Sequence, residues 1–160
     1  MSIKVGDRLP SVTLTTMTDE GPKPLTTTEL CEGKKVVLFA VPGAFTPTCS
    51  VQHLPGFINN IQSFKDRGVD SVACVSVNDP FVMGAWGKDR GVGEDVLMLS
   101  DGNGEFTAAI GLEMDGSGFG LGTRSQRYAM IVDDGVVSTL NVESGPGLDV
   151  SSAETILSKL

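Results

Sequence analysis

Two largely apolar runs, Val36–Val41 and Ser71–Val77, constrain the fold of this chain more than any other feature of its sequence. Because the apolar residues follow one another without alternation, both faces of each strand are expected to be buried, as in the centre of a sheet with helices on both sides. A stretch with helical spacing follows each run, at 48–65 and at 81–88. This alternation of strand and helix predicts a parallel α/β unit.

Local signals at the ends of these helices support the same organisation. Gly68 closes the first helix, and Pro55 is expected to kink it, because proline cannot donate the backbone hydrogen bond of a helix interior. The tripeptide Asn78-Asp79-Pro80 is typical of a helix cap followed by proline at the first helical position. A third strand is expected at 96–99.

The rest of the chain carries shorter signals. Thr26 and Glu29 are spaced as a capping box, and so are Ser151 and Glu154. Asp133-Asp134-Gly135 is a strong hairpin sequence. The further elements expected are a strand near 11–15, a short helix ending at 33, a helical stretch at 106–110, a glycine-rich loop at 116–122, strands at 128–132 and 136–140, and a final helix to 160.

Together these signals predict one α/β domain over residues 1–160, a thioredoxin-like three-layer sandwich with a mixed central sheet between helices. A content of 40% hydrophobic and 20% charged residues is that of a globular protein. The net charge of −8 argues against nucleic acid or an anionic membrane surface as a partner. The amino-terminal residues lack the apolar core of a signal peptide, so a cytoplasmic location is expected.

Cysteine usage is sparse. Cys31, Cys49 and Cys74 are odd in number and widely spaced, which predicts neither a disulfide framework nor a metal site. Cys74 lies within a strand and is expected to be a small buried hydrophobic residue, whereas Cys31 is expected to be a partly exposed, incidental thiol. In a reducing compartment, a single cysteine in a special setting is a candidate for catalysis.

Cys49 has such a setting, at the end of the octet Pro42–Cys49 that follows the first buried strand. Thr46 and Pro47 are typical of an N-cap and a first helical residue, which places Cys49 in the first turn of the helix. The free backbone N–H groups of a first turn and the positive end of the helix dipole both favour negative charge on sulfur.

The helix alone is not expected to activate the thiol. Cysteine reacts as its thiolate, and an unperturbed cysteine is only a few per cent ionised at neutral pH. An activated thiol needs roughly 3–4 kcal/mol of thiolate stabilisation, whereas a helix terminus contributes at most about 2 kcal/mol. A cation from elsewhere in the chain is therefore expected beside Cys49.

The chain resembles the peroxiredoxins, and specifically the type II or peroxiredoxin-5-like branch. Pro42, Thr46 and Cys49 match the active-site pattern of that family, and they fall on the predicted turn from strand to helix. The resemblance runs from about Ile3 to the carboxyl end. It is reinforced in the segments His53–Phe57, Val77–Val82, Ala85–Trp86 and Arg124–Met130.

The resemblance implies roles for particular residues. Cys49 would be the nucleophile that attacks the peroxide, and Arg127 would be the missing cation, with Arg124 on the surface or at the edge of the site. Pro42 would shield the thiolate from water. Thr46 would hydrogen-bond to the sulfur and to the peroxide, and the backbone N–H groups of Thr48 and Cys49 would complete the cradle.

The implied activity is reduction of hydrogen peroxide and small alkyl hydroperoxides through a sulfenic acid at Cys49, without a cofactor. Some relatives resolve the sulfenic acid with a cysteine before the last helix, but the segment Gly145–Ser151 has none. Recycling by glutathione with glutaredoxin, or by thioredoxin, is therefore expected, and Cys74 remains a candidate resolving thiol. Relatives of this type tend to be homodimers, in which Phe45, Phe81 and Phe119 could make apolar contacts.

Other interpretations of the same residues remain. The protein could instead be a peroxide sensor or redox relay that passes oxidation from Cys49 to a partner, or a non-enzymatic interaction domain. His53, four residues after Cys49, suggests a cysteine–histidine protease, but the octet lacks a matching oxyanion motif, and a structural or proton-shuttling role is favoured. The glycine-rich loop lacks the strand and helix that flank a dinucleotide cradle.

Overall fold

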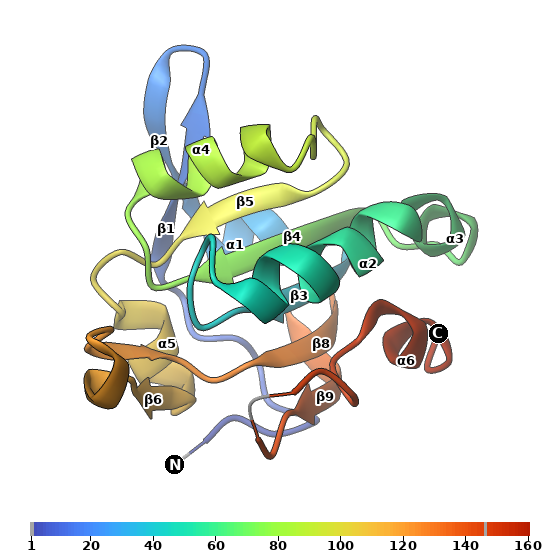
Figure 1. Cartoon of the computed structure of the whole chain (residues 1–160). Coiled ribbons are helices and arrows are strands. Elements are labelled where there is room, and N and C mark those ends of the chain that lie inside the picture. Colours follow the sequence, from blue (N-terminus) through green and yellow to red (C-terminus); the bar gives the residue numbers. More distant parts are fainter. Residues whose placement is uncertain (1, 146) are drawn as a thin grey trace.

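A computed structural model of the chain describes residues 2–145 and 147–160. Its central feature is a seven-stranded sheet with the order β2-β1-β5-β4-β3-β8-β9 (Figure 1). The strands of this sheet are β1 (Thr13–Thr18), β2 (Gly21–Thr26), β3 (Lys35–Ala40), β4 (Ser71–Ser76), β5 (Leu97–Ser100), β8 (Tyr128–Asp133) and β9 (Val136–Val142).

The two apolar runs form the middle of this sheet. Strands β3, β4 and β5 are parallel, whereas β8 pairs antiparallel with β3 and β1 pairs antiparallel with β5. Every residue of β3 from Val36 to Ala40 is buried, as expected for a strand covered on both faces. The expected mixed sheet with a parallel centre is confirmed.

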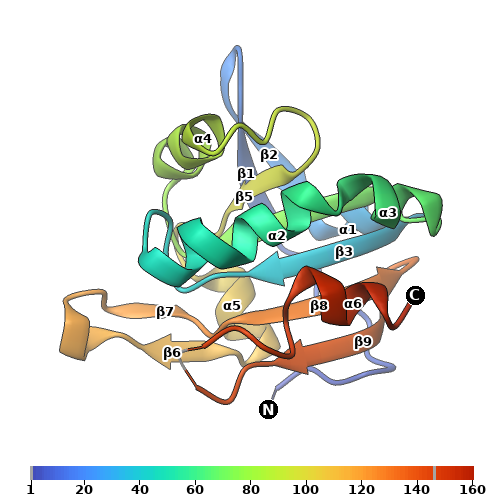
Figure 2. The same cartoon turned by 45° about the vertical axis from the view of Figure 1, so that its right-hand side comes forward.

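Helices cover both faces of the sheet, so the three layers expected from the sequence are present (Figures 1 and 2). One core packs β-sheet residues against α2, α3, α4 and α6, and the other packs them against α1 and α5. No helix among the described residues has the length and apolar composition that crossing a bilayer would require. The α-helices are α1 (Thr27–Cys31), α2 (Leu54–Asn59), α3 (Ile61–Asp66), α4 (Pro80–Asp89), α5 (Glu105–Ile110) and α6 (Ala153–Leu157).

Several turn and cap signals are confirmed at the residues that carried them. Thr26 and Glu29 form a capping box at α1, and Asp79 caps α4 by accepting from the backbone N–H of Val82. In the β8–β9 hairpin Asp134 and Gly135 have φ of 48° and 84°, the positive values that this tight turn requires.

Two strand pairs were not predicted. The strand expected near 11–15 lies at Thr13–Thr18 and pairs with β2, which contains Pro22 and Pro24. Proline is tolerated there because β2 is at the edge of the sheet. A second, two-stranded sheet of β6 (Glu113–Asp115) and β7 (Thr123–Ser125) encloses the glycine-rich loop and its 3-10 turn η2 (Ser117–Phe119), and it projects from the main body (Figure 2).

The helix expected at 48–65 is present in three parts instead of one kinked rod. A π-helical turn, η1 (Cys49–His53), precedes α2, and a break at Asn60 separates α2 from α3. The backbone N–H of Leu54 donates to the carbonyl of Cys49, five residues back. Pro55 cannot donate, and its ring would crowd the carbonyl of Val51 in a regular helix, so the wider turn takes the place of the expected kink.

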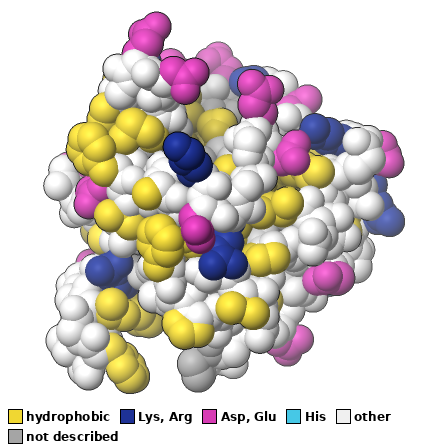
Figure 3. Space-filling view, turned by 45° about the horizontal axis from the view of Figure 1, so that its top comes forward, with side chains coloured by type: hydrophobic (Ala, Val, Ile, Leu, Met, Phe, Trp, Pro, Cys, Tyr) yellow, Lys and Arg dark blue, Asp and Glu magenta, His cyan; other side chains and the backbone are white. Residues whose placement is uncertain are grey.

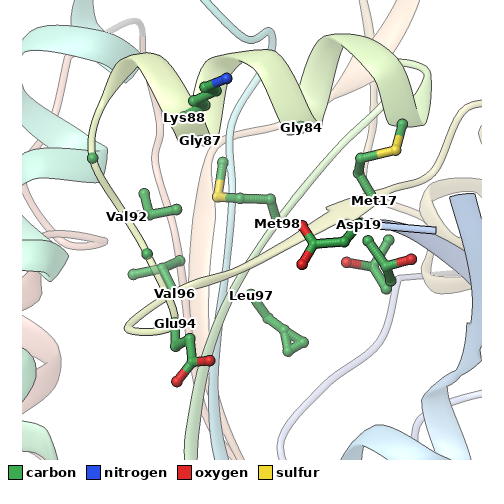
Figure 4. Close-up of a pocket in the computed structure, with 14 residues that line it drawn as sticks. Met17, Asp19, Gly84, Gly87, Lys88, Val92, Glu94, Val96, Leu97 and Met98 are labelled. Atoms are coloured by element: carbon green, nitrogen blue, oxygen red, sulfur yellow. The ribbon is translucent and has the colours of Figure 1, made fainter. Parts of the chain in front are cut away.

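Helix α4 packs closely on the sheet because two of its residues are glycines. A Cβ atom on Gly84 would lie 2.8 Å from Cβ of Met17, and one on Gly87 would lie 2.8 Å from Cγ of Met98. Both methionines lie in the groove under α4 in Figure 4, beside a cavity of about 770 Å³ that no residue of the octet lines. The close approach of α4 also carries its buried Trp86 toward the octet.

Candidate active site

The octet makes the turn from β3 into the following helix. Phe45 has a φ of 66°, in the left-handed region that a residue other than glycine rarely adopts. Both the backbone N–H and the hydroxyl of Thr46 donate to the carbonyl of Gly43, at 3.4 and 2.7 Å. Helical structure begins at Pro47, so the expected N-cap at Thr46 and first helical position at Pro47 are where the structure has them.

Cys49 therefore lies in the first turn of a helix. The first intrahelical bond runs from the N–H of Ser50 to the carbonyl of Thr46, at 2.9 Å. The N–H groups of Thr48 and Cys49 precede it, among the donors that a helix start leaves without an intrahelical acceptor. They are available to a negative charge or to a ligand oxygen at this end of the helix.

Thr46 differs from its expected arrangement. Its hydroxyl proton is directed to the carbonyl of Gly43, and within the described part of the chain no hydrogen bond joins this hydroxyl to the sulfur of Cys49. A hydroxyl that donates its proton keeps lone pairs that accept. Thr46 is thus arranged to accept a hydrogen bond from a ligand rather than to donate one to the thiol.

Residues outside the octet hold it in place, and sequence reasoning missed them. Asn78 accepts from the backbone N–H of Ala44 at 3.0 Å through its side-chain oxygen. The indole N–H of Trp86 donates to the hydroxyl of Ser50 at 2.9 Å, and Arg90 donates to the Ser50 carbonyl at 3.2 Å. The sequence indicates Asn78 only as part of a helix cap, and no local pattern predicts its contact with Ala44.

The cation expected beside Cys49 is present. Arg127, immediately before β8, donates from Nη2 to the sulfur of Cys49 at 3.0 Å. The two side chains are 7% and 0% exposed, respectively. No carboxylate lies within ion-pair distance of Arg127 among residues 2–145 and 147–160. An isolated buried guanidinium is costly, and a thiolate at Cys49 would neutralise it.

His53 belongs to the same site but does not contact the thiol. Its Nδ1 lies 2.9 Å from Nη1 of Arg127, and its Nε2 lies 2.9 Å from the carbonyl oxygen of Ser151. Because arginine can only donate, Nδ1 must accept and Nε2 must carry the proton. Both ring nitrogens are thus engaged away from Cys49, which is not the arrangement of a cysteine–histidine protease.

The surroundings keep this histidine neutral. The ring is fully buried, with the rings of Phe39 and Phe57 at centroid distances of 5.0 and 5.6 Å. Burial, and next the neighbouring charge of Arg127, lower the pKa of His53 to about 3, whereas the Ser151 carbonyl and Glu143 act in the opposite direction. At neutral pH His53 is therefore an uncharged acceptor that fixes the orientation of Arg127.

Arg124 lies at the edge of the site, which is one of the two positions expected for it from the sequence. Its Nε donates to the carbonyl of Leu121 at 2.8 Å, and its Nη1 donates to the carbonyl of Val77 at 3.1 Å. The same Nη1 would lie 3.4 Å from a Cβ atom on Gly43. Arg124 thus joins the glycine-rich loop to the chain beside the octet.

The other two cysteines are buried. Cys74 is in the same core as Cys49, and complete burial raises its pKa well above the ordinary value. The expectation that Cys31 is partly exposed was wrong: it is 1% exposed, in the core on the other face of the sheet, and burial raises its pKa to about 11. The short helix α1 turns Cys31 inward with Leu30, which the sequence pattern did not indicate.

The site therefore combines one thiol, one buried cation and a set of backbone donors. It can hold a thiolate and stabilise a second negative charge that develops next to it. Within the described ranges, no group of three or more histidine, cysteine, aspartate or glutamate residues is arranged to bind a metal ion.

Comparison with known proteins gives a consistent result. The sequence model of the Redoxin family matches residues 4–157. Peroxiredoxin-2E of Arabidopsis thaliana, described as chloroplastic, is 52% identical over an alignment that covers 99% of this chain and 70% of that protein.

Solved structures resemble the whole chain. Reduced Prx3 from Vibrio vulnificus in complex with hydrogen peroxide has a TM-score of 0.94 and 58% identity, with 98% of each chain covered. A putative thioredoxin reductase from Burkholderia cenocepacia has a TM-score of 0.98 and 46% identity, covering 100% of this chain and 99% of that one. The thioredoxin-like fold expected from the sequence is confirmed.

The buried neutral His53 predicts a pH dependence of stability. Its pKa is near 6.5 in the unfolded chain and about 3 in the folded one, so between these values the unfolded state binds more protons. The free energy of unfolding should fall as the pH is lowered through this window, by at most roughly 1.4 kcal/mol per pH unit from this group. Urea unfolding at several pH values measures it.

The control is the variant His53→Gln, which lacks a titrating ring and isolates the contribution of His53 from that of the carboxylates. Subtracting its pH profile from that of the unmodified protein should leave a slope between the two pKa values. Parallel profiles would show that His53 is not held neutral.

Proposed function

Because the chain belongs to the Redoxin family and is a type II peroxiredoxin, a class of thiol-dependent peroxidases, we propose that Cys49 attacks the peroxide with Arg127 as its cation. The observation that carries this assignment is the 3.0 Å hydrogen bond from the buried Arg127 to the sulfur of Cys49. The proposed substrates are hydrogen peroxide and small alkyl hydroperoxides.

The chemistry is a displacement at oxygen. The thiolate of Cys49 forms a bond to the terminal oxygen of the hydroperoxide as the oxygen–oxygen bond breaks. The sulfur becomes a sulfenic acid, and the other oxygen leaves as hydroxide or alkoxide and takes up a proton to give water or alcohol. Arg127 and the N–H groups of Thr48 and Cys49 would stabilise the charge on the leaving oxygen.

Two further residues would orient and protect the reacting atoms. The Thr46 hydroxyl, whose proton goes to Gly43, would accept the hydrogen bond of the peroxide O–H and so turn this oxygen toward the sulfur. Pro42, half-buried at the end of β3, would exclude water from the thiolate. Neither role calls for a bound cofactor, and no cofactor enters the proposed cycle.

Peroxiredoxins act with thioredoxin-like reductants, and for this chain we propose recycling by glutathione with glutaredoxin, or by thioredoxin. The reductant thiolate forms a bond to the sulfenic sulfur as the sulfur–oxygen bond breaks; the oxygen leaves as hydroxide and takes up a proton to give water. The resulting mixed disulfide is then attacked by a second thiol, which releases the Cys49 thiolate. Burial supports an external reductant, because Cys31 lies across the sheet from Cys49 and Cys74 is fully enclosed. The segment Gly145–Ser151 has no cysteine, and its Pro146 lies outside the described residues.

The Burkholderia likeness does not lead us to propose a reductase. The glycine-rich loop of this chain joins β6 to β7 through η2 (Ser117–Phe119). A dinucleotide fingerprint needs a strand before the loop and a long helix after it, because the helix N-terminus binds the pyrophosphate. We propose a cytoplasmic location as well, since three free thiols suit a reducing compartment.

The first test separates the roles of Cys49 and Arg127. We expect Cys49→Ser to abolish peroxide consumption. Arg127→Gln should slow both peroxide reduction and alkylation of Cys49 near pH 6 by tenfold or more, because the buried cation that favours the thiolate is lost. Arg124→Gln removes the same charge at the edge of the site and serves as the control. Equal alkylation rates in the unmodified protein, Arg127→Gln and Arg124→Gln would contradict the role assigned to Arg127.

The second test concerns recycling. Intact mass after one equivalent of peroxide should show one added oxygen, and subsequent glutathione should convert it to a glutathione adduct at Cys49. Loss of two hydrogens would instead indicate a disulfide with Cys74 or Cys31. Rapid oxidation followed by slow recovery with glutathione, glutaredoxin and thioredoxin alike would favour the sensor or relay role over the peroxidase cycle.

We further propose that the protein forms a homodimer through the loops around the site. Phe45, Phe81 and Phe119 are 51%, 66% and 88% exposed, and Figure 3 shows apolar side chains gathered toward one side of the face it presents. Sedimentation at micromolar concentration should give a dimer, and Phe119→Ser should shift it toward the monomer. Val5→Ser, at another exposed apolar residue, is the control; a monomer before substitution would refute the proposal.

A further inference from the structure

The hydrogen bonds around the thiol continue beyond Arg127 to the carboxyl-terminal part of the chain. Arg127 contacts His53, and the Nε2–H of His53 donates to the carbonyl of Ser151. The backbone N–H and the hydroxyl of Ser151 both donate to one carboxylate oxygen of Glu143, at 2.8 and 2.6 Å. This oxygen also accepts from the N–H of Asp149 at 2.9 Å.

This series of hydrogen bonds from Arg127 to Glu143 returns to Arg127. Glu143 follows β9 directly, and its backbone N–H donates to the carbonyl of Arg127 at 2.9 Å, one residue beyond the paired strands β8 and β9. Glu143 therefore holds Arg127 twice, at the backbone directly and at the guanidinium through Ser151 and His53. A closed ring of hydrogen bonds leaves the guanidinium fewer orientations than an open chain would.

The inner members of the ring are buried. Ser151 and His53 are both 0% exposed, so the hydrogen bond between them does not compete with bulk water, whereas Glu143 is half-buried. The sequence predicts Ser151 as the cap of the last helix, whereas in the structure Ser152 caps α6 by accepting from the N–H of Thr155. The side chain of Ser151 is thereby left to Glu143, and its carbonyl to His53.

We propose that Glu143 is a positioning residue for the peroxidase reaction: its carboxylate fixes the Ser151 carbonyl, which orients His53 and through it the Arg127 guanidinium against the Cys49 sulfur. Glu143 touches neither substrate nor sulfur, so its effect is on geometry and on the thiolate. This inference rests on the proposed roles of Cys49 and Arg127.

The charge state of Glu143 agrees with this role. Burial alone would raise its pKa, but the hydrogen bonds from Ser151 and Asp149 outweigh burial and lower it. The carboxylate is therefore ionised at the pH at which a peroxidase of this kind works, and it accepts all three bonds. Replacing it by a neutral side chain removes the strongest acceptor of the ring.

The experiment compares Glu143→Ala and Glu143→Gln with Glu154→Gln. Glu154 is an exposed residue of α6 in the same part of the chain, so its variant makes the same change of charge outside the ring. We expect Glu143→Ala to slow alkylation of Cys49 near pH 6, and kcat/KM for hydrogen peroxide, by about tenfold, which corresponds to roughly 1.4 kcal/mol. Glu143→Gln keeps one acceptor oxygen, so its alkylation rate and kcat/KM should fall by a smaller factor. Both quantities should be unchanged in Glu154→Gln.

A second readout separates positioning from stability. Nitrogen-15 NMR of His53 should show Nε2 protonated and Nδ1 accepting in the unmodified protein, and an altered Nε2–H signal in Glu143→Gln. Ser151→Ala removes only the hydroxyl and keeps the carbonyl that His53 uses, so it should retain the signal and at least a third of the alkylation rate. A purely structural role would lower the urea midpoint and leave alkylation of the folded protein and the NMR signal unchanged.

The outcomes distinguish this inference from the proposed function. Alkylation and NMR need no peroxide turnover. An unmodified protein that fails to consume peroxide would therefore refute the proposed function, while the alkylation and NMR results would still test the positioning role of Glu143. If folded Glu143→Gln has the same alkylation rate and the same His53 signals as the unmodified protein, the positioning role of Glu143 is refuted. If Glu143→Ala does not fold, the near-isosteric Glu143→Gln carries the decision.

Discussion

The structure around the reactive thiol depends on one buried cation. Arg127 is almost fully removed from water and has no carboxylate within ion-pair distance among the described residues. A thiolate at Cys49 would balance its charge, and His53 accepts one further hydrogen bond from its Nη1. Fold stability and thiol reactivity are thereby linked, because the state that satisfies the arginine is also the state that reacts.

This cation joins parts of the chain that are far apart in sequence. The octet brings Cys49 from the end of β3, and the hairpin of β8 and β9 brings Arg127 and Glu143. The segment before α6 brings Ser151 to His53. The antiparallel pairing of β8 with β3 and with β9 places the end of β3, the start of β8 and the end of β9 together at one end of the strands (Figure 1).

Local features of the site were predictable, and its long-range contacts were not. Thr46 and Pro47 mark a helix start through nearest-neighbour geometry, so the place of Cys49 followed from the sequence. The contact of His53 with Arg127 spans 74 residues and that with Ser151 spans 98, and neither leaves a mark in the sequence pattern. Ser151 was misassigned for a related reason: Glu154 three residues later suggests a capping box, but the Ser151 hydroxyl bonds to the distant Glu143 and Ser152 caps α6.

The wide turn at Cys49–His53 sets a length requirement for the site. Before this turn, β3 and the bonds of Thr46 to Gly43 fix the direction in which helical side chains point around the helix axis. After it, burial of Leu54 and Phe57 in the core fixes that direction. The π turn holds one residue more than an α-helical turn and absorbs the difference between these directions. A chain one residue shorter here would rotate either the thiol or the core residues by about 100°, so the spacing itself is part of what makes this cysteine reactive.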